Sequence, residues 1–180
     1  MEKDERARWL FPRREGTVEG THTGTDLADL DPDDPDDRHS LVLADHPELQ
    51  AAIRDDAGEI EVGGEPMSPT LHIGFHVVVA NQILDDDPPE VWLAAQRLEG
   101  LGYDRHEILH MLAGAAAQQT WSAMAERRPY DRTQHLADLD ALPASWEAER
   151  PRGRASTAQA RPRPRPPRRR KESGRKRKRR

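Results

Sequence analysis

The sequence predicts an all-α fold: a small bundle of about four to six helices, flanked by a disordered N-terminal arm and a basic C-terminal tail. Two observations support this prediction. The clearly bounded segments between residues 45 and 147 begin with helix-capping residues or proline and carry apolar residues at helical spacing. In addition, only 34% of the residues are hydrophobic while 34% are charged, so only part of the chain can enter a core.

The first two helices of the bundle are marked by proline at their starts. A short helix is expected from Pro47 to about Asp55. A longer helix is expected after Ser68, which is suited to capping, with Pro69 in its first turn and its end near Leu84. Because this second helix is apolar nearly all round, it should be the central, buried helix.

The remaining helices follow equally clear boundaries. Asp87 is the expected cap of a third helix that stops at Gly100. Asp104 begins a long alanine-rich helix that reaches about residue 127. A short helix is expected after Asp131, and Pro143 can open another. The fold class therefore rests on six helical segments.

Charge divides the chain into an acidic and a basic part. Residues 1–150 hold 13 Lys and Arg against 32 Asp and Glu, whereas residues 151–180 hold 15 Lys and Arg against one Glu. Blocks of like charge stay solvated and commonly act as interaction tails. We therefore expect a disordered acidic arm over residues 1–44, a helical, histidine-rich domain over 45–147, and a disordered Pro/Arg/Lys-rich tail over 148–180.

The sequence excludes several classes of site and suggests a location. It contains no cysteine, so it has no disulfide and no thiolate ligand or nucleophile, and any metal must be bound by nitrogen and oxygen. The first residues lack the apolar core of a signal peptide, and no run of apolar residues is long enough to cross a membrane. We expect a cytoplasmic protein without membrane contact.

Two histidine pairs are the most informative feature of the chain. His72 and His76 lie four residues apart in one expected helix, and His106 and His110 lie four apart in another. Residues four apart share one helix face, so each pair can direct two imidazoles to one point. Imidazole is the commonest protein ligand for zinc and also binds iron. The sequence therefore predicts a divalent metal site, with zinc preferred and iron as an alternative; a metal-free cluster of hydrogen-bonded histidines stays open.

The second pair also matches the HExxH pattern of zinc hydrolases. In that pattern Glu107 would act as the general base. The same glutamate lies three residues after Asp104, which is the spacing of a capping box, so it can have a purely structural role. Ala113 and Ala116 occupy the positions where a metzincin has glycine and histidine. A hydrolase is therefore the alternative and not the preferred function.

The other histidines and one acidic run have plainer expectations. Four histidines stand in polar surroundings and are expected at the surface: His22, His39, His46 and His135. The run from Asp85 to Asp87 could attract a cation, but solvated acids at a helix start are the simpler interpretation.

The chain resembles a bacterial family known as domain of unknown function 1841. The resemblance covers about residues 46–146 and rests on three features: the LHIGFH run with its following Ala-Asn-Gln, the Asp-Pro-Pro-Glu helix start, and Gly-Tyr-Asp before HEILH. It implies a small helical domain without an established activity. Relatives often have Glu after the first histidine pair, where this chain has Val77, so a possible carboxylate ligand is missing.

Three hypotheses for the function follow. The first is a helical metal-binding domain whose tail, residues 151–180, contacts RNA, the ribosome, DNA or another anionic partner without sequence specificity. The second is a metal-dependent hydrolase that uses Glu107. The third is a metal-free interaction adaptor. The sequence leaves the oligomeric state open.

Overall fold

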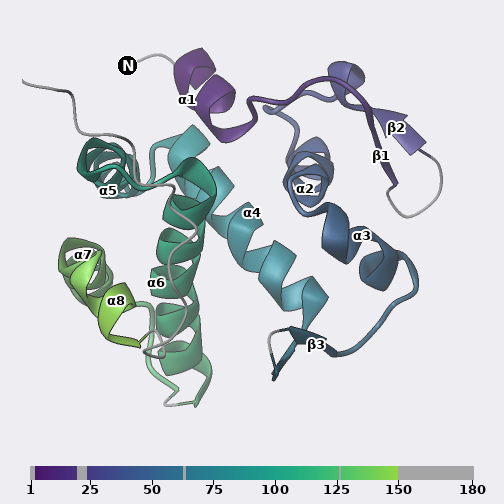
Figure 1. Cartoon of the computed structure of the whole chain (residues 1–180). Helices are drawn as coiled ribbons and strands as arrows, with labels where there is room; N and C mark the ends of the chain where they lie inside the picture. The colour runs from purple at the N-terminus through teal and green to yellow at the C-terminus, as the bar shows by residue number, and fades with distance from the viewer. Residues whose placement is uncertain (1–2, 20–23, 63, 126, 150–180) are drawn as a thin grey trace, which may run out of the picture.

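The computed structural model describes residues 3–19, 24–62, 64–125 and 127–149 (Figure 1). Within these residues it contains eight α-helices, one short 3-10 helix and two antiparallel hairpins, which confirms the all-α class. The helices are α1 (Lys3–Leu10), α2 (Pro35–Ala44), α3 (Pro47–Arg54), α4 (Pro69–Asp85), α5 (Glu90–Leu101), α6 (Arg105–Ala125), α7 (Arg132–Ala141) and α8 (Ala144–Glu149), and the 3-10 helix is Leu27–Asp29. The hairpins pair β1 (Thr17–Glu19) with β2 (Gly24–Asp26) and β3 (Ile60–Val62) with β4 (Glu65–Met67).

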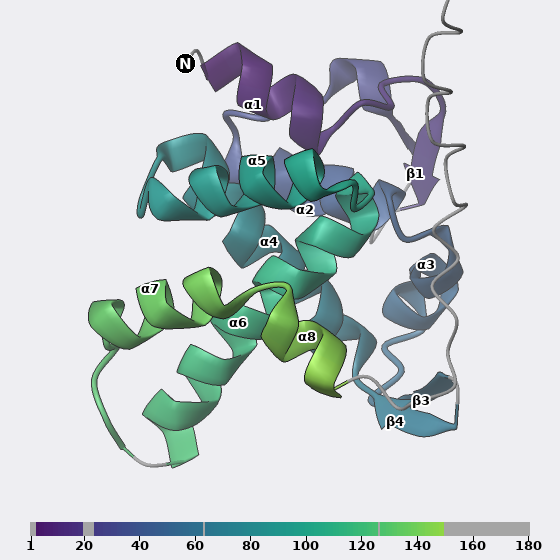
Figure 2. The same ribbon diagram turned by 60° about the vertical axis from the view of Figure 1, so that its left-hand side comes forward.

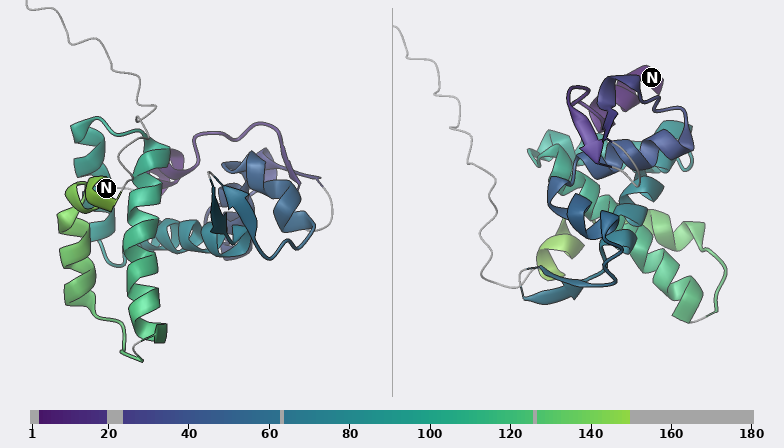
Figure 3. Two further views of the ribbon diagram at one scale, coloured as in Figure 1. Left: turned by 60° about the horizontal axis from the view of Figure 1, so that its bottom comes forward. Right: turned by 90° about the vertical axis from the view of Figure 1, so that its right-hand side faces the viewer.

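Helix α4 is the central helix, as the sequence predicts. The Ser68 side chain accepts a hydrogen bond from the Leu71 backbone N–H, and Pro69 fills the first position of the helix. Ile73, Val79 and Ile83 are fully buried along its length. The helix packs against α6 on one side and against α2 on another, and Figure 3 shows it bridging these two parts of the molecule.

Helix α5 ends two residues later than expected. The chain leaves the helix at Gly102, whose φ of 98° lies in the left-handed region that favours glycine, whereas Gly100 stays inside the helix. Asp104 then caps α6, since its Oδ1 accepts from the Glu107 N–H at 2.9 Å. Helices α5 and α7 pack beside α6, as Figure 2 shows.

The first 44 residues contain more regular structure than we expected. Helix α1, the β1–β2 hairpin and helix α2 occupy much of the segment that we expected to be disordered. The prolines of the acidic run do not prevent a helix: Asp34 caps α2 by accepting from the Asp36 N–H, and Pro35 takes the first helical position. Leu41, Val42 and Leu43, at the end of α2, are buried in the core.

Two buried arginines join this N-terminal segment to the end of α4. The Arg38 guanidinium donates to Asn81 Oδ1 at 2.9 Å and to both oxygens of Asp85, and its side chain is only 5% exposed. Arg6 donates to the Ile83 carbonyl at 3.0 Å and pairs with Asp86 at 2.7 Å. The cations that these two aspartates attract are therefore arginines of the same chain.

Parts of the expected arm and tail lie outside the described residues. Residues 150–180 hold nearly all of the basic tail, and 1–2 and 20–23, with His22, belong to the arm. None of the described helices combines the length and the apolarity needed to cross a bilayer.

Candidate metal centre

The two histidine pairs meet where α4 and α6 pack together. His72 and His76 lie one turn apart on α4, and the ring centroids of both are close to that of His110 on α6, at 5.2 Å and 4.8 Å. His76 is almost fully buried, while His72 and His110 are half-buried. The packing of α4 on α6 therefore brings rings from both histidine pairs together.

A fifth histidine, which we expected at the surface, completes the cluster. His46 lies in the two-residue link between α2 and α3 and is 1% exposed. Its ring centroid is 4.5 Å from that of His76 and 5.1 Å from that of His72. The apolar run Leu41–Ala44, which ends two residues before His46, was the sequence signal that could have placed it inside the fold.

A hydrogen bond from Nδ1 fixes the orientation of the His46 ring. Nδ1 donates to the Val42 carbonyl at 2.9 Å. Because a carbonyl oxygen can only accept, Nδ1 carries a proton, and in the neutral form of this ring the lone pair is on Nε2. A backbone carbonyl that holds the outer N–H of a histidine is the usual support of a metal ligand.

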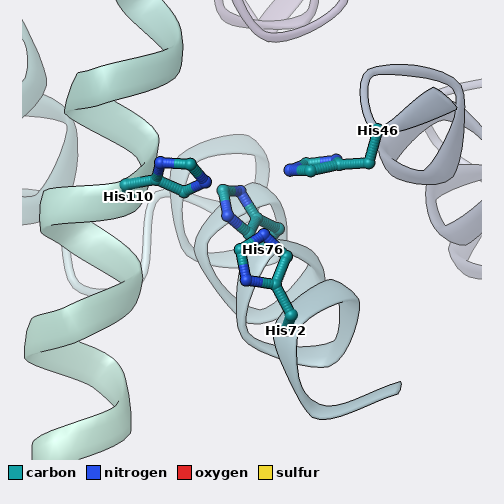
Figure 4. Close-up of side chains that lie close together, drawn as sticks. All are labelled: His46, His72, His76 and His110. Atoms are coloured by element: carbon teal, nitrogen blue, oxygen red, sulfur yellow. The ribbon is translucent and has the colours of Figure 1, made fainter. Parts of the chain in front are cut away.

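One ring nitrogen from each of four histidines lies within 4.8 Å of the others. The four are His46, His72, His76 and His110, and their rings converge from three parts of the chain (Figure 4). With zinc–nitrogen bonds of 2.0–2.1 Å, ligand nitrogens in a tetrahedral site are about 3.4 Å apart. The nitrogens would therefore approach by at most about 1.4 Å, a distance that side-chain rotations can cover.

His106 lies beside this group but outside it. Its ring centroid is 4.4 Å from that of His110 and 5.1 Å from that of His46. Of the four ligands predicted from the sequence, the structure thus groups His72, His76 and His110, and His46 joins them in place of His106.

The surroundings of the cluster favour uncharged rings. Burial, followed by the neighbouring imidazoles, lowers the pKa of His76 to about 2 and that of His110 to about 3. The same causes lower the pKa of His72 and of His106. The Nε2 atoms of His46, His76 and His110 are buried without a hydrogen-bond partner among the described residues. Burial therefore favours uncharged rings at His72, His76 and His110, and a neutral imidazole with an unused lone pair is the state that binds a cation.

The other candidate residues are less closely connected to this centre. Glu107 is buried next to the start of α6 and belongs neither to the four-nitrogen group nor to the residues that line the adjoining cleft. Trp121, near the end of α6, is 70% exposed. His39 is exposed as expected, but His135 is 1% exposed within α7 and burial lowers its pKa.

The cluster opens on one side to a cleft of about 290 Å³. His72, His76 and His110 contribute to its wall, and the rest is formed by Phe75, Ala113, Gly114, Ala117 and Trp146. On the other side His46 lies among the buried residues of α1 and α2, including Leu10 and Val42. The four histidines thus lie between the enclosed interior near α1 and α2 and the accessible cleft.

Comparison with known families supports the resemblance seen in the sequence. The model of the family described as domain of unknown function (DUF1841) matches residues 29–141. The chain belongs to this family. The DUF1841 match begins upstream of the boundary that we expected at residue 45, includes all of α2, and contains all five clustered histidines. Neither the curated proteins nor the solved structures gave a match to the chain.

Proposed function

We propose that this DUF1841 protein binds one divalent metal ion through His46, His72, His76 and His110. The observation that supports this proposal is the convergence of one ring nitrogen from each of the four histidines. In addition, the Nε2 atoms of His46, His76 and His110 are buried without a hydrogen-bond partner among the described residues. Buried polar atoms without partners cost about 1–3 kcal/mol each, and a cation would remove that cost. Imidazole ligands without thiolates suit zinc first, with iron as the alternative.

A metal-free histidine core is the competing interpretation. In such a core the rings would be expected to hydrogen-bond to one another or to neighbouring acids. Among the described residues, the hydrogen bond that fixes a ring of the four is the one from His46 Nδ1 to the Val42 backbone carbonyl. This bond orients the ring but leaves its inner nitrogen for a further ligand, which supports the metal hypothesis.

Metal binding is tested with full-length protein prepared without a histidine tag. We expect equilibrium dialysis against Zn²⁺ to give one ion per chain. Excess zinc at about 100 times its Kd should raise the free energy of unfolding by about 2.7 kcal/mol. No bound zinc and no change in stability would overturn the proposal and favour the adaptor.

Single substitutions identify the ligands. His46→Ala, His76→Ala and His110→Ala should each weaken zinc binding at least tenfold, whereas His39→Ala, at an exposed position, should leave it unchanged. The structure and the sequence differ in the fourth ligand, which is His46 in the structure and His106 in the sequence prediction. We therefore expect His106→Ala to weaken zinc binding less than His46→Ala does. Equal zinc affinity in the wild type and all variants would contradict the site.

We further propose that the basic segment, residues 151–180, binds RNA or DNA through phosphates, on the ribosome or elsewhere. The support is its charge, with 15 Lys and Arg against one Glu, and its lack of aromatic residues for base stacking. Affinity for a 20-nucleotide RNA should fall steeply between 50 and 200 mM salt and be lost when these residues are deleted. An absence of binding by the full chain at low salt would refute this part.

A further inference from the structure

The cleft beside the four histidines has two chemically different parts. One is formed by the nitrogen-bearing rings of His72, His76 and His110. The other is carbon surface from Phe75, the alanines of α6 and Trp146 of α8. A molecule in this cleft would contact the metal position at one end and apolar side chains at the other.

The charge of a bound ion defines the first part of such a molecule. Among the described residues the four-nitrogen group contains no carboxylate, so a divalent ion held there would keep its full charge of +2. Glu48 acts on the His72 ring, Asp104 acts on the His110 ring, and Asp45 acts on the neighbouring His106 ring. None of these three acids lines the cleft. Asp45 is moreover paired with Arg105 at 2.6 Å. An anionic donor arriving through the cleft would supply the missing negative charge.

The walls of the cleft define the second part. A volume of about 290 Å³ suits a small molecule and not a folded partner. Phe75 and Trp146 offer aromatic surface, and Gly114 leaves room beside Trp146, since a Cβ at this glycine would lie 3.9 Å from the indole. These walls stabilise a ligand by removing its apolar surface from water.

We propose that the cleft binds a small amphiphilic anion, an inference that rests on the proposed metal site. The carboxylate or similar donor of this anion coordinates the ion, and its apolar body lies against Phe75 and Trp146. Zinc can expand from four to five ligands, and in that geometry the donor would add to the four histidines without displacing one. The protein would then recognise small apolar acids, as a sensor, a carrier or an enzyme acting on them.

Full-length protein loaded with Co²⁺ tests this assignment, because the visible absorption of Co²⁺ reports its ligands. Phenylacetate should change the spectrum with a Kd at least tenfold lower than that of acetate, and neutral phenylacetamide should leave the spectrum unchanged. Ala117→Leu, which narrows the cleft, should weaken the binding of phenylacetate at least tenfold, while Co²⁺ stays bound. Ala125→Leu, an exposed position on the same helix outside the cleft, is the matched control.

The outcomes distinguish the two proposals. If Co²⁺ binds but phenylacetate at saturating concentration leaves its spectrum unchanged, the metal site stands and the ligand proposal is refuted. Equal affinities for acetate and phenylacetate would also refute it, because the apolar walls would then have no effect. If the protein binds neither Co²⁺ nor Zn²⁺, the proposed function fails and the ligand proposal fails with it.

Discussion

Acid should destabilise the metal-free protein through His76. Its pKa is about 2 in the folded protein, against an ordinary value of 6.5. Below pH 6.5 the unfolded chain therefore binds a proton at this histidine that the folded protein does not bind. The free energy of unfolding is thus highest above pH 6.5 and falls as the pH decreases toward the folded pKa. Between pH 7 and pH 5 this single group accounts for a loss of about 2 kcal/mol.

Urea unfolding at pH 7, 6 and 5 in the presence of a chelator measures this loss. The wild type and the His39→Gln control should both lose stability over this range, and His76→Gln should lose about 2 kcal/mol less. Because the comparison concerns the slope with pH, an overall change in stability of the variant does not affect it. The same pH slope in His76→Gln and in the wild type would show that His76 is not held uncharged by its surroundings.

Three further predictions concern the scaffold and the alternative function. Arg38→Met should lower the free energy of unfolding by about 1–2 kcal/mol, because Asn81 and the half-exposed Asp85 lose their donor; an unchanged urea midpoint would contradict this. Gly102→Ala should cost about 1 kcal/mol in the same assay because of the positive φ, and a stabilising effect would show that the helix end is not left-handed. Glu107→Gln should leave zinc at one ion per chain and cost no more than about 1 kcal/mol, since its backbone N–H still donates to Asp104; loss of zinc would place Glu107 at the metal.

The helices of the domain could be predicted from sequence because their boundaries depend on local chemistry. Ser68 and Asp104 cap α4 and α6 with their own side chains, and both were identified from residue type and spacing alone. The end of α5 was misplaced because Gly100 and Gly102 are equivalent candidates locally. Only the backbone conformation, a positive φ at Gly102, decides between them.

The N-terminal helices could not be predicted in the same way because their stability depends on distant partners. The acidic run before α2 looks unfavourable in isolation, and the buried Arg38 finds Asn81 and Asp85 more than 40 residues away. The same dependence explains the histidines. The four-residue spacing reveals pairs on one helix face, but nothing local connects His46 to them. The other histidines come close to His46 only when α2 is packed against α4.

The position of His46 between α2 and α3 has a consequence for folding. An ion shared by His46, His76 and His110 would tie together three points of the chain and close two successive loops of about 30 residues each, as a disulfide does elsewhere. In a cysteine-free chain of this polarity, such a cross-link would restrict the unfolded ensemble where covalent bridges are absent. Loss of the ion would then loosen the attachment of the first 54 residues before it disturbs the packing of α4 on α6.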